Sequence, residues 1–358
     1  MEEKLAALNA LVAYARANSP FYARHLPEGE IESPADLARL PLCSAEDIRE
    51  HGREMLCCPA SRVRRIVSLE TSGTSGRPKR LCFTEADLER TVDFFHHGME
   101  RVCGPYRRVA IFLPGNSPDG LCQLLAAGIR RFGGTPLYYG PIADYGDAAR
   151  WSREQRADTL VGIPAQIRRL ALTAPDLGYR RALLSSDSLP RSLGETIARK
   201  WDCQVLNHYG MTESGYGLAV QYPGEAAMSL RKDLYLERLP DGELVLTTLF
   251  REAMPLIRYR TGDLGRLSPE GDVLELLGRK TELTRPVTLR QLDETLFAQD
   301  GVLDYVAAVQ GGVLRVTVLG RAGDARAALE EAFPEYRPEV EEIDALPPAG
   351  GKRALRWE

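Results

Sequence analysis

The sequence predicts an α/β fold: a large N-terminal domain of helix-covered, mainly parallel sheets with a small antiparallel sheet or barrel, and a small α+β C-terminal domain. Three observations support this prediction. Between residues 108 and 207, short apolar runs alternate with helical stretches. After residue 228, the pattern changes to short strands separated by Pro and Gly turns. The length of 358 residues also favours two domains over one.

The elements of the larger domain follow from apolar spacing. Apolar residues at helical spacing between Leu5 and Tyr14 predict an opening helix that ends before Pro20. Two strands are expected at residues 63–69 and 81–83. Five more are expected at 109–113, 135–139, 159–163, 182–185 and 204–207, separated by helices at 121–131, 145–156, 166–172 and 192–201. Such alternation implies right-handed crossovers and a parallel sheet covered by helices.

The second half of the chain reads differently. Short strands are expected at 233–239, 243–249 and 256–260, as in a small antiparallel sheet or distorted barrel. The remainder contains a helix at 289–297, a strand at 314–319 and a helix at 325–333, followed by a Gly-rich tail. This part predicts a compact α+β unit.

Composition excludes several classes of partner. Lys and Arg number 46 against 50 Asp and Glu, the net charge is -4, and the signs are interleaved, so we expect neither nucleic acid nor a membrane as a partner. No apolar run approaches the roughly 20 residues of a membrane span, and the N-terminus lacks signal-peptide features, which indicates a cytoplasmic protein. The seven scattered cysteines should be reduced and mostly buried.

A glycine- and hydroxyl-rich run, TSGTSGRPK, lies between the first two predicted strands. Its glycines allow positive φ angles that turn backbone N–H groups toward one point, and its hydroxyls and lysine add donors and charge. The run therefore predicts a polyphosphate site formed by Thr71, Ser72, Gly73, Thr74, Ser75, Gly76 and Lys79. It is not a Walker P-loop, because Pro78 precedes the lysine. A surface loop without a ligand is the alternative.

Further motifs follow in a fixed order: YGMTE at 209–213, YRTGD at 259–263, GRK at 278–280 and Gly351-Lys352 near the C-terminus. With these motifs, the chain resembles the adenylate-forming superfamily of acyl-CoA synthetases, and within it the phenylacetate-CoA ligase branch. The resemblance to that branch rests on NSPFY at 18–22, LP at 40–41, EDIR at 46–49, LTTL at 246–249 and MPLIRYR at 254–260. It spans nearly the whole chain.

The resemblance implies an enzyme that uses ATP and Mg²⁺ to convert a carboxylic acid to acyl-AMP and then transfers the acyl group to CoA. It also implies an N-terminal AMP-binding domain at 1–279 and a small mobile C-terminal domain at 280–358. The segment after Arg279 departs from the family pattern, since the usual acidic pair and Gly-rich turn are absent. The position of the hinge therefore stays open.

The resemblance also assigns roles to residues. Glu213 is the expected Mg²⁺ ligand, Thr212 contacts the α-phosphate, and Lys352 is the expected catalytic lysine of the C-terminal domain. Tyr209 offers a face for adenine, Asp263 accepts from the ribose hydroxyls, and Arg279 contacts phosphate or ribose. The remaining expected nucleotide-binding residues are Ser186, Asp187, His208, Gly210 and Met211. Each has a plainer alternative as a turn residue, a solvated charge or, for Lys352, part of a basic tail.

The sequence specifies the carboxylic-acid substrate and the acyl acceptor less closely than the nucleotide site. His96, His97, residues 112–117 and the pair Tyr138-Tyr139 are candidates for lining an acid pocket that suits an apolar or aryl acid. A carrier-protein thiol, an amine or a cofactor is the alternative acceptor to CoA. A nucleotide-binding protein without turnover is the alternative outside enzymes, and a homodimer stays open.

Overall fold

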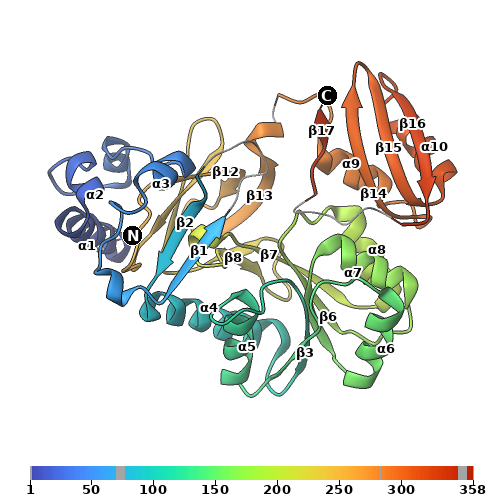
Figure 1. Ribbon diagram of the computed structural model, residues 1–358, viewed down its shortest axis with the longest axis horizontal. Helices are drawn as coiled ribbons and strands as arrows, with labels where there is room; N and C mark the ends of the chain where they lie inside the picture. The colour runs from blue at the N-terminus through green and yellow to red at the C-terminus, as the bar shows by residue number, and fades with distance from the viewer. Residues whose placement is uncertain (1, 70–76, 283, 346–352, 358) are drawn as a thin grey trace. The chain divides into compact units, whose positions relative to one another are not determined.

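The structure is a computed structural model that describes residues 2–69, 77–282, 284–345 and 353–357. These residues form two compact units (Figure 1). Unit 1 comprises Met1–Gly98, Ser117–Gly128 and Tyr209–Lys280, and unit 2 comprises Met99–Asn116, Ile129–His208 and Thr281–Glu358. The predicted division into domains after residue 279 stays a prediction. No helix in the described ranges has the length and apolar composition to cross a membrane.

Helices and a hairpin open unit 1. The first helix, α1 (Glu2–Asn18), ends before Pro20 as predicted, and Ser19 then caps α2 (Pro20–His25) by accepting a hydrogen bond from the Tyr22 backbone N–H. Strands β1 (Arg65–Leu69) and β2 (Lys79–Phe83) pair antiparallel, with Leu69 opposite Lys79. The remaining helical elements are the 3₁₀ helix at Pro34–Arg39, α3 (Ala45–His51), the 3₁₀ helix at Ala60–Arg62, α4 (Glu85–Cys103) and α5 (Leu121–Arg131), the last two continuing into unit 2.

The strands after Leu218 in unit 1 form an antiparallel array in the order β10-β11-β12-β13-β9-β8. They are β8 (Ala219–Gln221), β9 (Met228–Leu230), β10 (Leu234–Arg238), β11 (Glu243–Thr248), β12 (Tyr259–Leu267) and β13 (Val273–Arg279). The prediction of a strand at 256–260 is wrong about the first residue of that strand. The backbone N–H groups of Leu256 and Arg258 donate to the hydroxyls of Thr248 and Thr247 instead of entering the ladder, so the strand begins at Tyr259.

Unit 2 contains the predicted parallel sheet. Its order is β7-β6-β5-β3-β4, and all neighbours are parallel. The strands are β3 (Arg108–Phe112), β4 (Thr135–Tyr138), β5 (Thr159–Gly162), β6 (Arg181–Leu184) and β7 (Gln204–Tyr209), and the connecting helices are α6 (Tyr145–Gln155), α7 (Pro164–Thr173) and α8 (Arg191–Trp201). The alternation read from the sequence is therefore confirmed element by element, with ends shifted by a few residues.

The C-terminal segment belongs to unit 2 and packs on the helices of the parallel sheet. It forms α9 (Leu289–Leu296), α10 (Ala322–Ala332) and a sheet in the order β16-β15-β14-β17. These strands are β14 (Val302–Gln310), β15 (Val313–Gly320), β16 (Arg337–Ile343) and β17 (Arg356–Trp357). One apolar core joins Leu170 of α7 and Ile197 of α8 to Phe297 and Val302, so the segment shares its core with the helices.

A buried arginine on α7 forms hydrogen bonds with the C-terminal segment. The Arg168 side chain on α7 is fully buried, and its guanidinium donates to the carbonyls of Val302 at 2.7 Å and Gln299 at 2.8 Å. Burial lowers the pKa of Arg168 to about 10, so the group stays charged at neutral pH. At its side lies the Phe297 ring, whose centroid is 5.0 Å from the guanidinium carbon. A cation that has lost its water is therefore compensated by carbonyl groups of the C-terminal segment.

We expect Arg168→Ala to lower the free energy of unfolding by about 3 kcal/mol or more, because two buried carbonyls lose their donor at roughly 1–3 kcal/mol each. Arg199→Ala is the control, since Arg199 also joins the C-terminal segment, through Asp300, but is exposed; its loss should cost less than about 1 kcal/mol. Urea unfolding measures both. Equal, small effects of the two substitutions would contradict the structural importance of Arg168.

Candidate active site

Glu213 is the centre of a buried polar cluster in unit 1. It lies in the 3₁₀ turn Thr212–Ser214 and is 6% exposed. The Tyr259 hydroxyl donates to its Oε1 at 2.9 Å, and Lys79 forms an ion pair with the same oxygen. Lys79 begins β2 and Tyr259 begins β12, so three sequence motifs meet at one carboxylate.

The cluster fixes the charge states of its members. Burial opposes ionisation of Glu213, but the Lys79 ammonium outweighs it and holds the pKa of the carboxyl below its ordinary value. Burial, together with the Glu213 carboxylate, raises the pKa of Tyr259, which therefore remains a neutral donor. Both donors, Lys79 and Tyr259, contact Oε1 of this ionised carboxylate.

Two glycines allow the turn that carries Glu213 to lie against α4. Gly215 has φ +76°, and a Cβ there would lie 2.9 Å from the Thr91 hydroxyl. A Cβ at Gly217 would lie 2.1 Å from the Phe94 ring. The turn therefore needs glycine at both positions, one for its backbone conformation and both for space.

A second cluster in unit 1 joins three residues of separate motifs. The Tyr209 hydroxyl donates to Oδ2 of Asp263 at 2.6 Å, and Nε of Arg279 lies 3.0 Å from Oδ1. The register of β12 and β13 sets Asp263 opposite Arg279. Burial, with the Asp263 carboxylate beside it, holds the pKa of Tyr209 well above its usual range, so the phenol stays a donor. The residues expected at adenine and ribose are thus in direct contact.

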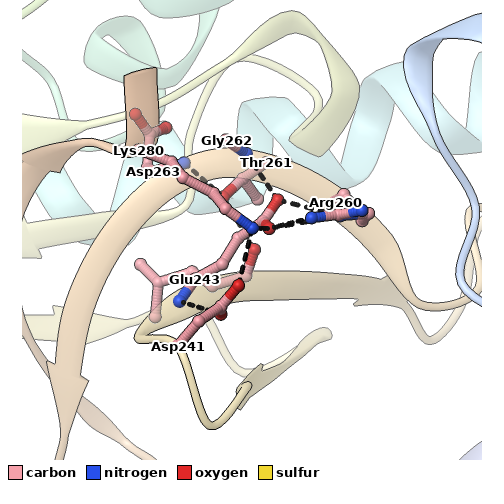
Figure 2. A network of polar contacts seen from close by, with 8 residues as sticks. Asp241, Glu243, Arg260, Thr261, Gly262, Asp263 and Lys280 are labelled. Carbon is pink, nitrogen blue, oxygen red and sulfur yellow. Dashed lines mark hydrogen bonds and ion pairs between the residues drawn. The ribbon is translucent and has the colours of Figure 1, made fainter. Parts of the chain in front are cut away.

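Gly262, the residue before Asp263, contacts a third buried carboxylate that the sequence analysis did not single out. Figure 2 shows Glu243 receiving donors from Arg260, Gly262 and Lys280. A charged residue at the head of the apolar strand 243–249 was the available signal, because such a residue is rarely buried unless it is paired.

Other expected site residues belong to unit 2. Ser186, with φ +75°, and Asp187 follow β6, and His208 is in β7, close to the carboxyl ends of these parallel strands as predicted. The Ser185 hydroxyl lies 2.7 Å from Nδ1 of His208, and burial lowers the pKa of His208 to about 4, so the ring is neutral at neutral pH. Asp187 accepts from the Ser188 N–H at 2.9 Å, as a turn aspartate does.

The remaining expectations stay predictions. Lys352 and six residues of the glycine-rich run, Thr71, Ser72, Gly73, Thr74, Ser75 and Gly76, lie outside the described residues. Gly210, Met211 and Thr212 form the turn that leads to Glu213, with the Met211 carbonyl accepting from the Tyr216 N–H at 2.9 Å. The pocket for the acid is not tested by these contacts. Across the described ranges, no group of three or more His, Cys, Asp or Glu side chains is placed to hold a metal ion.

Besides Glu243, two further supporting residues were missed by the sequence analysis. Tyr259 heads the motif YRTGD, so its sequence signal was present, but its bond to Glu213 is visible only in the fold. Arg251 is buried and donates to the Glu213 carbonyl at 2.6 Å. Burial lowers the pKa of Arg251 to about 10. No motif marks Arg251, because its role depends on packing against the Phe83 ring 4.8 Å away.

Comparisons with known proteins show which proteins this chain is similar to. The family model described as AMP-binding enzyme matches residues 67–233. The phenylacetate-coenzyme A ligase of Thermus thermophilus is 27% identical over 338 residues, which cover 86% of this chain and 74% of that protein. The phenylacetate-coenzyme A ligase of Pseudomonas putida is 25% identical over 300 residues, covering 75% of this chain and 66% of that protein, just under two thirds of its length.

Among solved structures, that of 2-hydroxyisobutyryl-CoA ligase in the postadenylation state, in complex with R3-HIB-AMP, is similar with a TM-score of 0.81. The match covers 99% of this chain and 88% of the other, at 19% sequence identity. At that identity the likeness shows the fold.

We expect the stability difference between the parent and Glu213→Gln to shrink on acidification. Because the folded pKa of Glu213 lies below its ordinary 4.5, the ionised carboxylate stabilises the fold above that pH, and this contribution disappears as the pH falls through the folded pKa. Urea unfolding from neutral pH to below pH 4.5 measures it, with the exposed Glu270→Gln as control. A difference that stays constant or grows toward acid pH would contradict the pairing with Lys79.

Proposed function

We propose that the chain activates an organic carboxylic acid with ATP and transfers the acyl group to CoA, because a model of AMP-binding enzymes matches residues 67–233 and a phenylacetate-coenzyme A ligase is similar to 86% of the chain. In the first step a carboxylate oxygen attacks the α-phosphorus, the bond to the β-phosphate breaks, and pyrophosphate leaves. In the second step the CoA thiolate attacks the acyl carbon and AMP leaves. The observation that carries the proposal is the convergence of Lys79, Tyr259 and Glu213 from three separate motifs.

The described residues suit a polyanionic nucleotide. Lys79 brings a cation to the end of β2 that adjoins the glycine-rich run, and Asp263 offers acceptor oxygens for ribose hydroxyls. Tyr209 and Arg279 contact the two oxygens of Asp263 and hold the carboxylate in one orientation. Such groups, fixed before the substrate arrives, stabilise developing charge without reorganisation in the transition state.

The residues also fit a magnesium ion. Mg²⁺ is usually bound by one or two carboxylates together with substrate phosphates and water, and the ionised Glu213 supplies one such hard oxygen. When bound, Mg²⁺ would neutralise charge on the phosphate oxygens and on departing pyrophosphate.

We further propose an apolar or aryl acid as the substrate. The support is the naming of both curated relatives as phenylacetate-coenzyme A ligases, together with the candidate pocket residues His96, His97 and 112–117. A non-CoA acceptor remains the second candidate, because the acceptor is inferred from the relatives.

Product analysis separates these functions. Purified protein is incubated with ATP, Mg²⁺ and single acids, including phenylacetate, with and without CoA. The proposal expects AMP, pyrophosphate and an acyl-CoA thioester in the presence of CoA. Pyrophosphate release without thioester formation would favour another acceptor, and nucleotide binding without pyrophosphate release under any condition would favour a non-catalytic binder.

We expect Glu213→Gln to lower turnover far more than it weakens AMP binding. The substitution removes the charged oxygen that suits a metal, but it leaves Tyr209 and Asp263 in place. Steady-state kinetics at saturating Mg²⁺ and calorimetric AMP binding measure the two effects, with exposed Glu270→Gln as the control. An unchanged turnover number would rule out the assignment of Glu213.

Lys352→Ala tests the expected catalytic lysine. Formation of acyl-AMP from acid and ATP should fall on the order of 100-fold or more, as loss of one transition-state donor typically costs. Transfer from supplied acyl-AMP to CoA should stay close to the parental rate, because the C-terminal segment would then present another face. Rapid-quench assays of each half-reaction measure this, with exposed Lys232→Ala as control. If both half-reactions fall together, Lys352 does not act in adenylation alone.

A further inference from the structure

The Asp263 carboxylate is carried on an irregular stretch of β12. Val245 of β11 is opposite Arg260, and Glu243 is opposite Leu264, so two steps along β11 span four steps along β12. The extra residues bulge out of the ladder at Gly262, whose φ is +73°. Beyond Leu264 the pairing with β13 shifts as well. Bulges of this kind turn a side chain away from the direction that a regular strand would give it.

In the bulge, backbone N–H groups that have no partner in the ladder donate hydrogen bonds to side chains instead. The Gly262 N–H donates to Oε1 of Glu243 at 3.3 Å. The Asp263 N–H donates to the Thr261 hydroxyl at 3.1 Å, and that hydroxyl donates to the Leu244 carbonyl at 2.8 Å. Glu243 therefore takes the place of a backbone partner at the apex of the bulge.

Glu243 is also the anion to which two cations bind. Its side chain is 2% exposed, and Oε2 lies 2.6 Å from Nη2 of Arg260 and 2.8 Å from Nζ of Lys280. Lys280 contacts Asp241 as well, at 2.6 Å, and Asp241 accepts from the Glu243 N–H at 3.1 Å (Figure 2). Burial opposes ionisation of Glu243, but the bonds from Arg260 and Lys280 outweigh it and lower its pKa.

We propose that Glu243 is a positioning residue for the nucleotide: its carboxylate holds residues 260–262 in the bulged form that aims Asp263. The inference rests on the proposed function for the identity of the ligand. Through Lys280, the residue directly after Arg279, the same carboxylate links the bulge to the end of β13. Glu243 itself touches neither substrate nor reacting atoms.

The link to Asp263 has a specific geometric reason. Asp263 and Arg279 face each other across β12 and β13, and each is the immediate neighbour of a residue bound to Glu243, Gly262 and Lys280 respectively. Loss of the carboxylate therefore frees the backbone on both sides of the Asp263–Arg279 pair.

The test compares Glu243→Gln with Glu275→Gln. Glutamine keeps the size of Glu243 but removes the charge that Arg260 and Lys280 pair with. Glu275 lies on β13 and pairs with Arg266 at 3.0 Å on the exposed surface, so it is the matched control. For Glu243→Gln, we expect the Kd for AMP and the KM for ATP to rise about tenfold and the KM for the acid to change little. Amide exchange in the peptide covering 260–263 should accelerate. In the control Glu275→Gln, the Kd for AMP, the KM for ATP and the amide-exchange rate should all stay at their parental values.

A second variant covers the case in which Glu243→Gln does not fold. Lys280 is partly exposed, and Lys280→Met removes one donor while leaving Arg260 and Gly262 bound to Glu243. It should raise the Kd for AMP about threefold and accelerate exchange at 260–263 to a smaller extent. Parental AMP affinity and parental exchange in either folded variant overturn the inference.

Failure of the proposed function gives a different result. In that case the parent itself would bind no AMP, or would bind AMP but release no pyrophosphate with any acid, whereas amide exchange at 260–263 would still report whether Glu243 holds the bulge.

Discussion

The free-energy cost of burying a carboxylate organises unit 1. An ionised carboxylate that leaves water loses several kcal/mol unless charged or hydroxyl donors replace that water. Glu213, Asp263 and Glu243 are each at most 6% exposed, and each is compensated by donors from other parts of the chain. Satisfying the three carboxylates brings the separate motifs of the sequence together. For Glu213 and Glu243, the same donors outweigh burial and lower the pKa of the carboxyl group.

Unit 2 shows the opposite case, a buried cation. Arg168 is compensated chiefly by carbonyl groups of the C-terminal segment, not by a directly bonded carboxylate. If that segment moved away from α7, the guanidinium of Arg168 would become solvated. The carbonyls of Val302 and Gln299 would lose their hydrogen bonds to it and would need other donors. If the C-terminal segment alternates between two positions by moving away from α7, this contact has to break.

The sequence predicted the parallel sheet well because the alternation of apolar runs and helices is a local signal. The prediction failed at the start of β12, since the hydroxyls of Thr248 and Thr247 accept the backbone N–H groups of Leu256 and Arg258, which therefore do not enter the ladder. Glu213, Asp263 and Arg279 were predicted as site residues from the resemblance of their motifs to a family. Glu243 and Arg251 were missed because their roles arise from burial and from partners distant in the sequence.

The central claim is that the buried carboxylates of unit 1 serve adenylation of a carboxylic acid. Acid-dependent exchange of labelled pyrophosphate into ATP, measured across a panel of apolar and aryl acids, tests it most directly. We expect exchange that requires both Mg²⁺ and one of the acids and that proceeds without CoA, because the first half-reaction is reversible and needs no thiol. A folded protein that binds AMP but catalyses no exchange with any acid would contradict the claim.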